Sequence, residues 1–120
     1  MNIQQSVKSV LSKYVTFSGR ASRSEYWWFV VALILAYVVV AIVGGAVSEQ
    51  VGGVLYLIVA LGTFLPALAV LIRRLHDVDR SGWWILIQII PLVGPILLIV
   101  WLASRGTAGA NRFGADPLAA

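Results

Sequence analysis

The sequence predicts an all-α membrane protein, and two features support this prediction. Hydrophobic residues make up 60% of the 120 residues and charged residues only 12%, whereas soluble domains average about 45–50% and about 25%. Charged residues are also absent from three long segments, at residues 26–47, 51–72 and 82–103. As a helix, each segment is about 33 Å long, enough to cross a hydrocarbon core about 30 Å thick. The pattern excludes a cytosolic enzyme, a disordered tail and a DNA-binding domain.

The chain length allows a single membrane domain, residues 1–120. We divide it into an N-terminal interfacial helix (1–19), a first helix (22–47), a second helix (51–72), a charged cytoplasmic connector (73–82), a third, proline-broken helix (83–103) and a cytoplasmic tail (104–120). The absence of cysteine excludes disulfides and thiolate-bound metals, and we expect neither a metal nor a cofactor. The net charge of +4 is expected to face anionic lipid headgroups and not nucleic acid.

The first part of the chain has an amphipathic pattern. Apolar residues recur at helical spacing, and polar residues take the other side; the apolar positions are Ile3, Val7, Val10, Leu11 and Tyr14. This pattern is typical of a short helix that lies in the membrane interface.

Ser22 and Glu25 predict the start of the first apolar helix. Their spacing fits a capping box, in which the Ser22 hydroxyl accepts from the Glu25 N–H and the Glu25 carboxylate accepts from the Ser22 N–H. Tryptophan pairs follow this start and the start of the third segment. Because indole rings are amphipathic, we expect them to anchor the protein at headgroup level; these anchors are Trp27, Trp28, Trp83 and Trp84.

Pro91 and Pro95 interrupt the third apolar segment, since proline lacks a backbone donor and clashes with the preceding turn. The segment is therefore either a kinked transmembrane helix or a re-entrant helical hairpin. A hairpin leaves all nine Lys and Arg on the cytoplasmic side, as the positive-inside rule favours, whereas a third crossing places the tail outside. The first arm of such a hairpin, residues 83–90, is only about 12 Å long and dips without crossing.

Charged residues that flank the apolar segments form the candidate site. If the N-terminal flank and the connector share a face, arginines outnumber carboxylates in one interfacial layer, which comprises Arg20, Arg23, Glu25, Arg73, Arg74, His76, Asp77, Asp79 and Arg80. Arginine–carboxylate pairs would hold the helix ends together. The surplus guanidinium groups would bind a phosphate, from a phospholipid headgroup or a phosphorylated ligand.

His76, Asp77 and Asp79 also raise two alternatives. They could bind a metal, but no second histidine, Glu-x-x-His motif or cysteine supports such a site. They could perform acid–base chemistry on a lipid headgroup, but no activated nucleophile accompanies them. We therefore assign no catalytic residue and expect no enzymatic activity. The break between Pro91 and Pro95 leaves a third alternative, an oligomeric small-solute transporter.

Four separated motifs extend over nearly the whole chain. They are Gly19-Arg20 with Arg23 and Glu25-Tyr26-Trp27-Trp28; Arg73-Arg74-Leu75-His76-Asp77; Asp79-Arg80-Ser81-Gly82-Trp83-Trp84 with Pro91 and Gly94; and Gly106-Thr107, Gly109, Asn111-Arg112-Phe113-Gly114 and Asp116-Pro117. In this order they resemble the family called domain of unknown function 805, which are small bacterial inner-membrane proteins. Ala108, Ala110 and Ala115 depart from the family pattern, which favours proline there.

The resemblance implies a multi-pass protein of the bacterial inner membrane with no established biochemical activity. Together with the residue pattern, it leads us to expect a structural or interaction module whose cytoplasmic face binds anionic lipid headgroups or a partner. Because a few helices bury little surface between them, a homo-oligomer or a larger membrane protein is a second kind of expected partner. We expect no nucleic acid.

Overall fold

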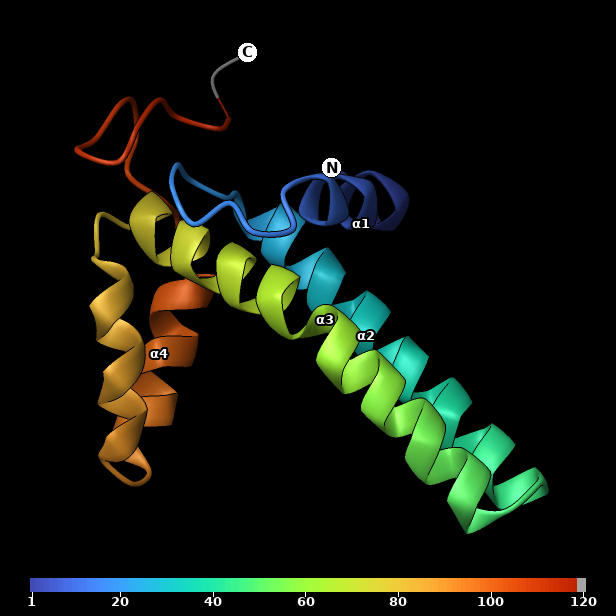
Figure 1. Cartoon of the computed structure of the whole chain (residues 1–120). Helices are drawn as coiled ribbons and strands as arrows, with labels where there is room; N and C mark the ends of the chain where they lie inside the picture. The colour runs from blue at the N-terminus through green and yellow to red at the C-terminus, as the bar shows by residue number, and fades with distance from the viewer. Residues whose placement is uncertain (119–120) are drawn as a thin grey trace.

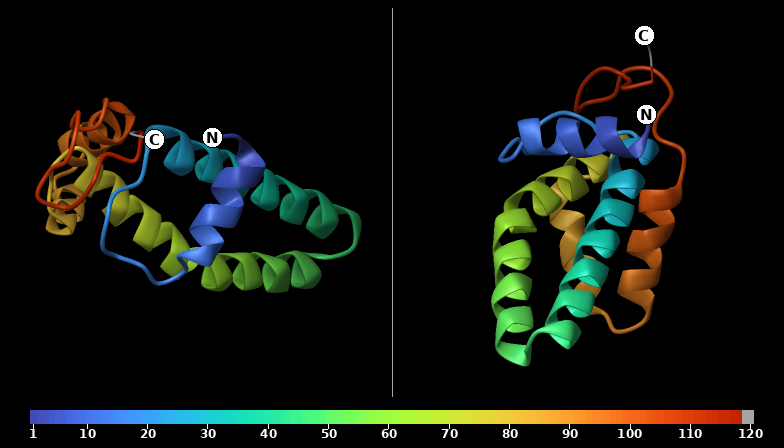
Figure 2. Two further views of the ribbon diagram at one scale, coloured as in Figure 1. Left: turned by 90° about the horizontal axis from the view of Figure 1, so that it is seen from above. Right: turned by 90° about the vertical axis from the view of Figure 1, so that its right-hand side faces the viewer.

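In the computed structural model, which describes residues 1–118, the chain forms five helices and no strand within those residues. The helices are α1 (Ile3–Ser12), α2 (Arg23–Ala46), α3 (Glu49–Asp77), the 3₁₀-helix η1 (Gly82–Ile89) and α4 (Val93–Ala103). α2 and α3 form a long hairpin, η1 and α4 form a shorter one, and the two hairpins diverge from a shared end (Figure 1). α1 crosses over α2 and α3 near that end (Figure 2). The all-α prediction is confirmed for the described residues.

α2 and α3 are long and apolar enough to cross a membrane, at 24 and 29 residues. Only 6% of the most apolar part of α2 and 17% of that of α3 is buried inside the protein. A core helix of a soluble protein would be mostly covered, so these uncovered apolar faces fit a lipid surrounding. They include Ile34, Val39, Ile42, Leu57, Ile58 and Leu61.

Ser48 and two glycines shape the turn between α2 and α3. The Ser48 hydroxyl caps α3 by accepting a hydrogen bond from the Val51 N–H at 3.1 Å. Gly44 and Gly52 bring the two backbones into contact, because a β-carbon on either would lie 2.9 Å from the Cα of the other. The Gly-rich connector therefore allows the two helices to pack closely at this end.

α3 extends past its expected end at residue 72 and reaches Asp77. Residues 73–77 belong to this helix and not, as we expected, to the charged connector, which shrinks to residues 78–81. Arg73 and Arg74 are buried. We expected these two arginines outside the helix because burying an unpaired arginine is costly. Both, however, have hydrogen-bond partners from distant parts of the chain.

Pro66 lies inside α3 and leaves the carbonyl of Gly62 without its helical donor, because proline has no N–H. The Tyr14 hydroxyl, from the segment that follows α1, donates a hydrogen bond to this carbonyl. The N-terminal segment is thereby attached to the middle of α3.

The third apolar segment folds back on itself. At the turn, Leu92 has a φ of 64°, and the Val93 N–H donates to the Pro91 carbonyl at 2.7 Å, which forms a γ-turn. Gly94 lets the arms meet, because a β-carbon there would lie 1.8 Å from the Ile87 carbonyl oxygen. The 8 residues of η1 and the 11 of α4 are each about 16 Å long. Each arm is therefore shorter than a hydrocarbon core of about 30 Å.

The apolar core lies at the shared end, in two clusters. One joins α1 to α2 and α3, through Val10, Ala21, Phe29 and Val70. The other joins α3 to α4, through Leu75, Leu98 and Leu102. The buried charged residues come from the same part of the fold.

Candidate functional site

Three ion pairs are buried where the helices meet. We call their five members the arginine cluster: Arg20, Glu25, Arg73, Arg74 and Asp77. No side chain in the cluster is more than 4% exposed. A buried charge is costly unless it is paired and hydrogen-bonded. The cluster therefore depends on its own pairing, and it brings together five of the nine residues in the predicted layer.

Glu25 and Arg73 join the start of α2 to the end of α3. Arg73 Nη1 donates to Glu25 Oε1 at 2.7 Å, and the Ser9 hydroxyl donates to Glu25 Oε2 at 3.3 Å. The predicted capping box is only half present. The Ser22 hydroxyl accepts from the Glu25 N–H at 3.2 Å, but the Glu25 carboxylate binds Arg73 and does not return to the Ser22 N–H. A buried guanidinium is the stronger partner for a carboxylate.

Asp77 accepts hydrogen bonds from two arginines. Arg20 Nε donates to Oδ1 at 3.0 Å, and Arg74 Nη1 donates to Oδ2. Arg74 also donates to the carbonyls of Leu102 and Ser104, the former at 2.9 Å. Asp77 thus joins the end of α3 to the segment before α2, and Arg74 joins it to the end of α4.

The tail, residues 104–118, closes over this end of the fold. Arg20 Nη1 and Nη2 donate to the carbonyls of Gly109 and Thr107, each at 2.6 Å. The Thr107 N–H donates to the backbone carbonyl of Asp77 at 2.7 Å. Gly106 is needed for this approach, because a β-carbon there would lie 2.0 Å from Asp77 Oδ2.

His76 fastens the tail and the segment before α2 to the end of α3. Its Nδ1 lies 2.9 Å from the Gly19 carbonyl oxygen, and its ring stacks on Phe113 with centroids 4.0 Å apart. Asn111 Nδ2 donates to the His76 carbonyl at 2.9 Å. Among residues 1–118, no group of three His, Cys, Asp or Glu side chains is placed to hold a metal ion.

The other residues of the predicted layer take no part in the three ion pairs of the arginine cluster. Arg80 lies over the Trp101 ring at 4.0 Å and over the Trp84 ring at 5.7 Å. Asp79 pairs with Arg112 at 3.3 Å, and both side chains are about half exposed. Arg23 is exposed on the first turn of α2.

The four predicted anchors differ in their surroundings. Trp27 Nε1 donates to the Leu102 carbonyl at 3.0 Å, so this ring connects α2 to α4. The other three predicted anchors, Trp28, Trp83 and Trp84, are exposed, and Trp83 is the most exposed at 78%. We did not predict a role for Trp101. It lies beside Trp84, with ring centroids 5.5 Å apart, because the third segment folds back, and the possible hairpin was the only feature of the sequence that pointed to this contact.

Positive charge is in excess at this end of the fold. The arginine cluster has three guanidinium groups and two carboxylates. Arg73 Nε and Nη2 have no hydrogen-bond partner within the described part of the chain. Arg23 adds a further guanidinium nearby, and it donates to the Ala103 carbonyl at 3.4 Å.

Two helices of membrane-spanning length, uncovered apolar faces and charged residues gathered at one end are typical of an integral membrane protein. The chain belongs to the family described as protein of unknown function (DUF805), whose profile matches residues 14–115. The resemblance noted in the sequence is thereby confirmed.

Two relatives come from Escherichia coli (strain K12). Inner membrane protein YhaI is 44% identical over 111 residues, which cover 91% of this chain and 92% of YhaI. Inner membrane protein YhaH is 44% identical over 115 residues, which cover 90% of this chain and 92% of YhaH. No solved structure matches the chain. The family and these relatives identify a bacterial inner-membrane protein.

Proposed function

We propose that the protein is a structural and interaction module of the inner membrane, without catalytic activity, that binds anionic phospholipid headgroups at its cytoplasmic face. The observation that supports this proposal is the excess of guanidinium groups over carboxylates where the helices meet. Excess positive charge at a membrane surface is stabilised by anionic headgroups.

The proposed placement in the membrane follows from the charge distribution. α2 and α3 cross the bilayer, η1 and α4 enter and return as a re-entrant hairpin, and α1 lies in the cytoplasmic interface. In support, the tail contacts Arg20 and Asp77, which places its basic residues at the end where α3 finishes. The opposite end, at the α2–α3 turn, carries Glu49 and no Lys or Arg, as the positive-inside rule favours.

The contacts of the polar residues favour a binding module over the alternative of a lipid-headgroup enzyme. Asp77 is shared by Arg20 and Arg74, and Asp79 pairs with Arg112. Both carboxylates bind arginines, and the His76 ring bonds to the Gly19 carbonyl instead of to either of them.

The exposed apolar faces of α2 and α3 also suit a second copy of the chain or a larger membrane protein. Such a partner would be additional to the lipid, because these faces have no charged side chains. Both anionic lipids and other membrane proteins are available in the inner membrane.

The test places the full chain in nanodiscs with equal amounts of phosphatidylglycerol and phosphatidylcholine, transfers it to mild detergent and counts retained lipids by native mass spectrometry. We expect phosphatidylglycerol to be retained several times more often, and less often as salt is raised. Equal retention of the two lipids contradicts the binding role. A lipid product that forms in vesicles and disappears in a folded His76→Ala variant contradicts the noncatalytic role.

A further inference from the structure

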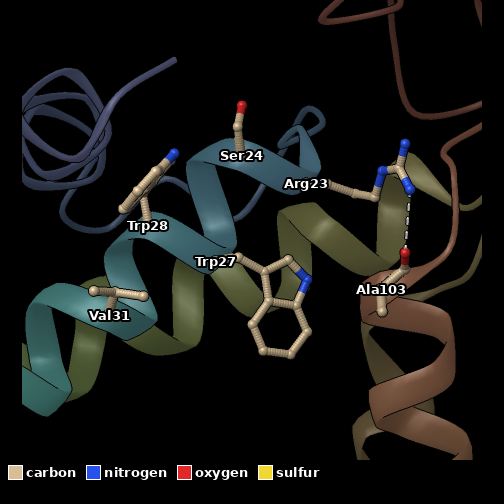
Figure 3. A pocket seen from close by; sticks show the side chains of 6 residues that line it. All are labelled: Arg23, Ser24, Trp27, Trp28, Val31 and Ala103. Atoms are coloured by element: carbon tan, nitrogen blue, oxygen red, sulfur yellow. Dashed lines mark hydrogen bonds between the residues drawn. The ribbon is translucent and has the colours of Figure 1, made fainter.

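A groove of about 480 Å³ lies between the first turns of α2 and the end of α4 (Figure 3). It is lined by Arg23, Ser24, Trp27, Trp28, Val31 and Ala103. Trp27 is fixed as one wall of the groove, because its indole N–H donates to the Leu102 carbonyl. Trp28 is 41% exposed and Val31 39% exposed, so an apolar surface is available beside the Trp27 ring.

The groove changes from polar to apolar along α2. Arg23 and Ser24 lie on the first turn, the tryptophans follow one turn later, and Val31 follows after another turn. The distance along the helix from Arg23 to Val31 is about 12 Å. The polar part is at the charged end of the protein, and the apolar part points toward the membrane-spanning section of α2. An amphipathic molecule with an anionic head and an alkyl chain matches this order.

Arg23 differs from the arginines of the cluster. Within the described part of the chain, Arg20, Arg73 and Arg74 each have a carboxylate within ion-pair distance, and Arg23 has none there. Its one hydrogen bond is to the Ala103 carbonyl, at 3.4 Å, which is long for such a bond. The Arg23 guanidinium can therefore bind a phosphate without giving up an ion pair.

Charge also distinguishes this groove from the apolar groove between α2 and α3. That groove, of about 410 Å³, is lined by apolar residues with Thr63 and two tyrosines, and it has no charged side chain. It offers contacts to an alkyl chain but none to an anionic head. Only a groove with a basic residue at its polar end selects an anionic lipid.

We propose that the groove between α2 and α4 binds one anionic phospholipid, with its phosphate on Arg23 and Ser24 and an acyl chain over Trp28 and Val31. This inference rests on the proposed function, because it assigns headgroup binding to one site. Arg23 supplies charge and paired donors for the phosphate oxygens, and Ser24 supplies a hydroxyl. The indole rings provide the amphipathic boundary between head and chain.

The experiment compares the full chain with two variants of the groove in the nanodisc and native mass spectrometry assay, with phosphatidylglycerol as the probe. Arg23→Gln removes the charge, and Val31→Trp fills the apolar part without changing charge. Each is expected to weaken retention of one bound phosphatidylglycerol by about tenfold, since a charge-assisted hydrogen bond or a filled site costs that much affinity. The exposed Val39→Trp, on the same helix outside the groove, is expected to retain the lipid.

Lys8→Gln is the matched charge control, because Lys8 lines a different groove between α1 and α2. If wild type prefers phosphatidylglycerol but Arg23→Gln and Val31→Trp retain it fully, the site assignment is wrong and the proposed function stands. If Lys8→Gln alone releases the lipid, the site is under α1 and the inference is again overturned. If wild type shows no preference for phosphatidylglycerol, both proposals fail.

Discussion

Gly106 and Asp77 approach so closely that a β-carbon at position 106 would lie 2.0 Å from the Asp77 carboxylate oxygen. The tail therefore passes over the arginine cluster with no space between its backbone and the carboxylate. Any side chain at position 106 must displace either the tail or the carboxylate that Arg20 and Arg74 share.

We predict from this contact that Gly106→Ala destabilises the protein by about 2 kcal/mol, the usual cost of overpacking a buried site. The measurement is the free energy of unfolding by denaturant in detergent micelles. Gly53→Ala is the control, because a β-carbon at Gly53 in α3 meets nothing within 4 Å and alanine favours the helix. A Gly106→Ala variant as stable as Gly53→Ala would show that the tail does not pack on Asp77.

The Arg73–Glu25 pair gives a second prediction. Glu25→Leu leaves Arg73 buried without a carboxylate, and we expect a loss of about 3–5 kcal/mol in unfolding free energy. The double variant Glu25→Leu/Arg73→Leu removes both charges and should lose less than Glu25→Leu alone. Glu49→Gln, at the exposed α2–α3 turn, should change stability by less than about 0.5 kcal/mol. A double variant that loses as much stability as Glu25→Leu, or more, would contradict a buried, coupled pair.

The proposed re-entrant hairpin predicts the sidedness of the tail. The chain has no cysteine, so single cysteines at Ser48 and Ala110 can be labelled selectively with a maleimide that does not cross the inner membrane. In intact spheroplasts we expect Ser48→Cys to be labelled and Ala110→Cys to be labelled only after permeabilisation. Labelling of Ala110→Cys in intact spheroplasts would establish a third crossing in place of the hairpin.

Asp116 gives a prediction about pH. The backbone N–H groups of Leu118 and Gly109 donate to its carboxylate and lower its pKa below the ordinary value of 3.8. Because the folded pKa is depressed, these bonds stabilise the tail at pH values above 3.8 and are lost as the pH falls through the folded pKa. Hydrogen exchange at the Gly109 amide, corrected for its intrinsic pH dependence, should lose protection over that interval. Asp116→Asn should remove this pH dependence, and protection that is equal in both proteins would contradict the assignment.

The sequence was informative where the membrane constrains the chain. The cap at Ser22 and the charge-free segment that ends at residue 47 predicted α2 to within one residue at each end, since residues 22–47 were expected and Arg23–Ala46 is observed. Pro91 marked the place where the third apolar segment is interrupted. The spacing of the prolines does not determine whether the helix continues beyond this point with a kink or folds back as a hairpin. The γ-turn at Leu92 and the close contact at Gly94 belong to the folded-back arrangement.

The candidate site was predictable in composition but not in the pairing of residues from distant segments. Arg20 and Asp77 are 57 positions apart, and Arg73 and Glu25 are 48 apart, so no local spacing relates them. The same limitation led us to expect Arg80 and Asp79 in the same layer. Their partners, Trp101 and Arg112, lie in segments whose positions depend on the fold-back and on the tail.

Tyr14 has a consequence for how the long hairpin can move. Its hydroxyl supplies the Gly62 carbonyl with the donor that Pro66 cannot provide. In an apolar layer a carbonyl without a donor costs several kcal/mol, so peeling the N-terminal segment away would expose a hinge at the midpoint of α3. Detachment of the segment that holds Tyr14 would therefore leave the Gly62 carbonyl unpaired in the middle of α3, so a change at the N-terminal end of the chain would alter the stiffness of the long hairpin.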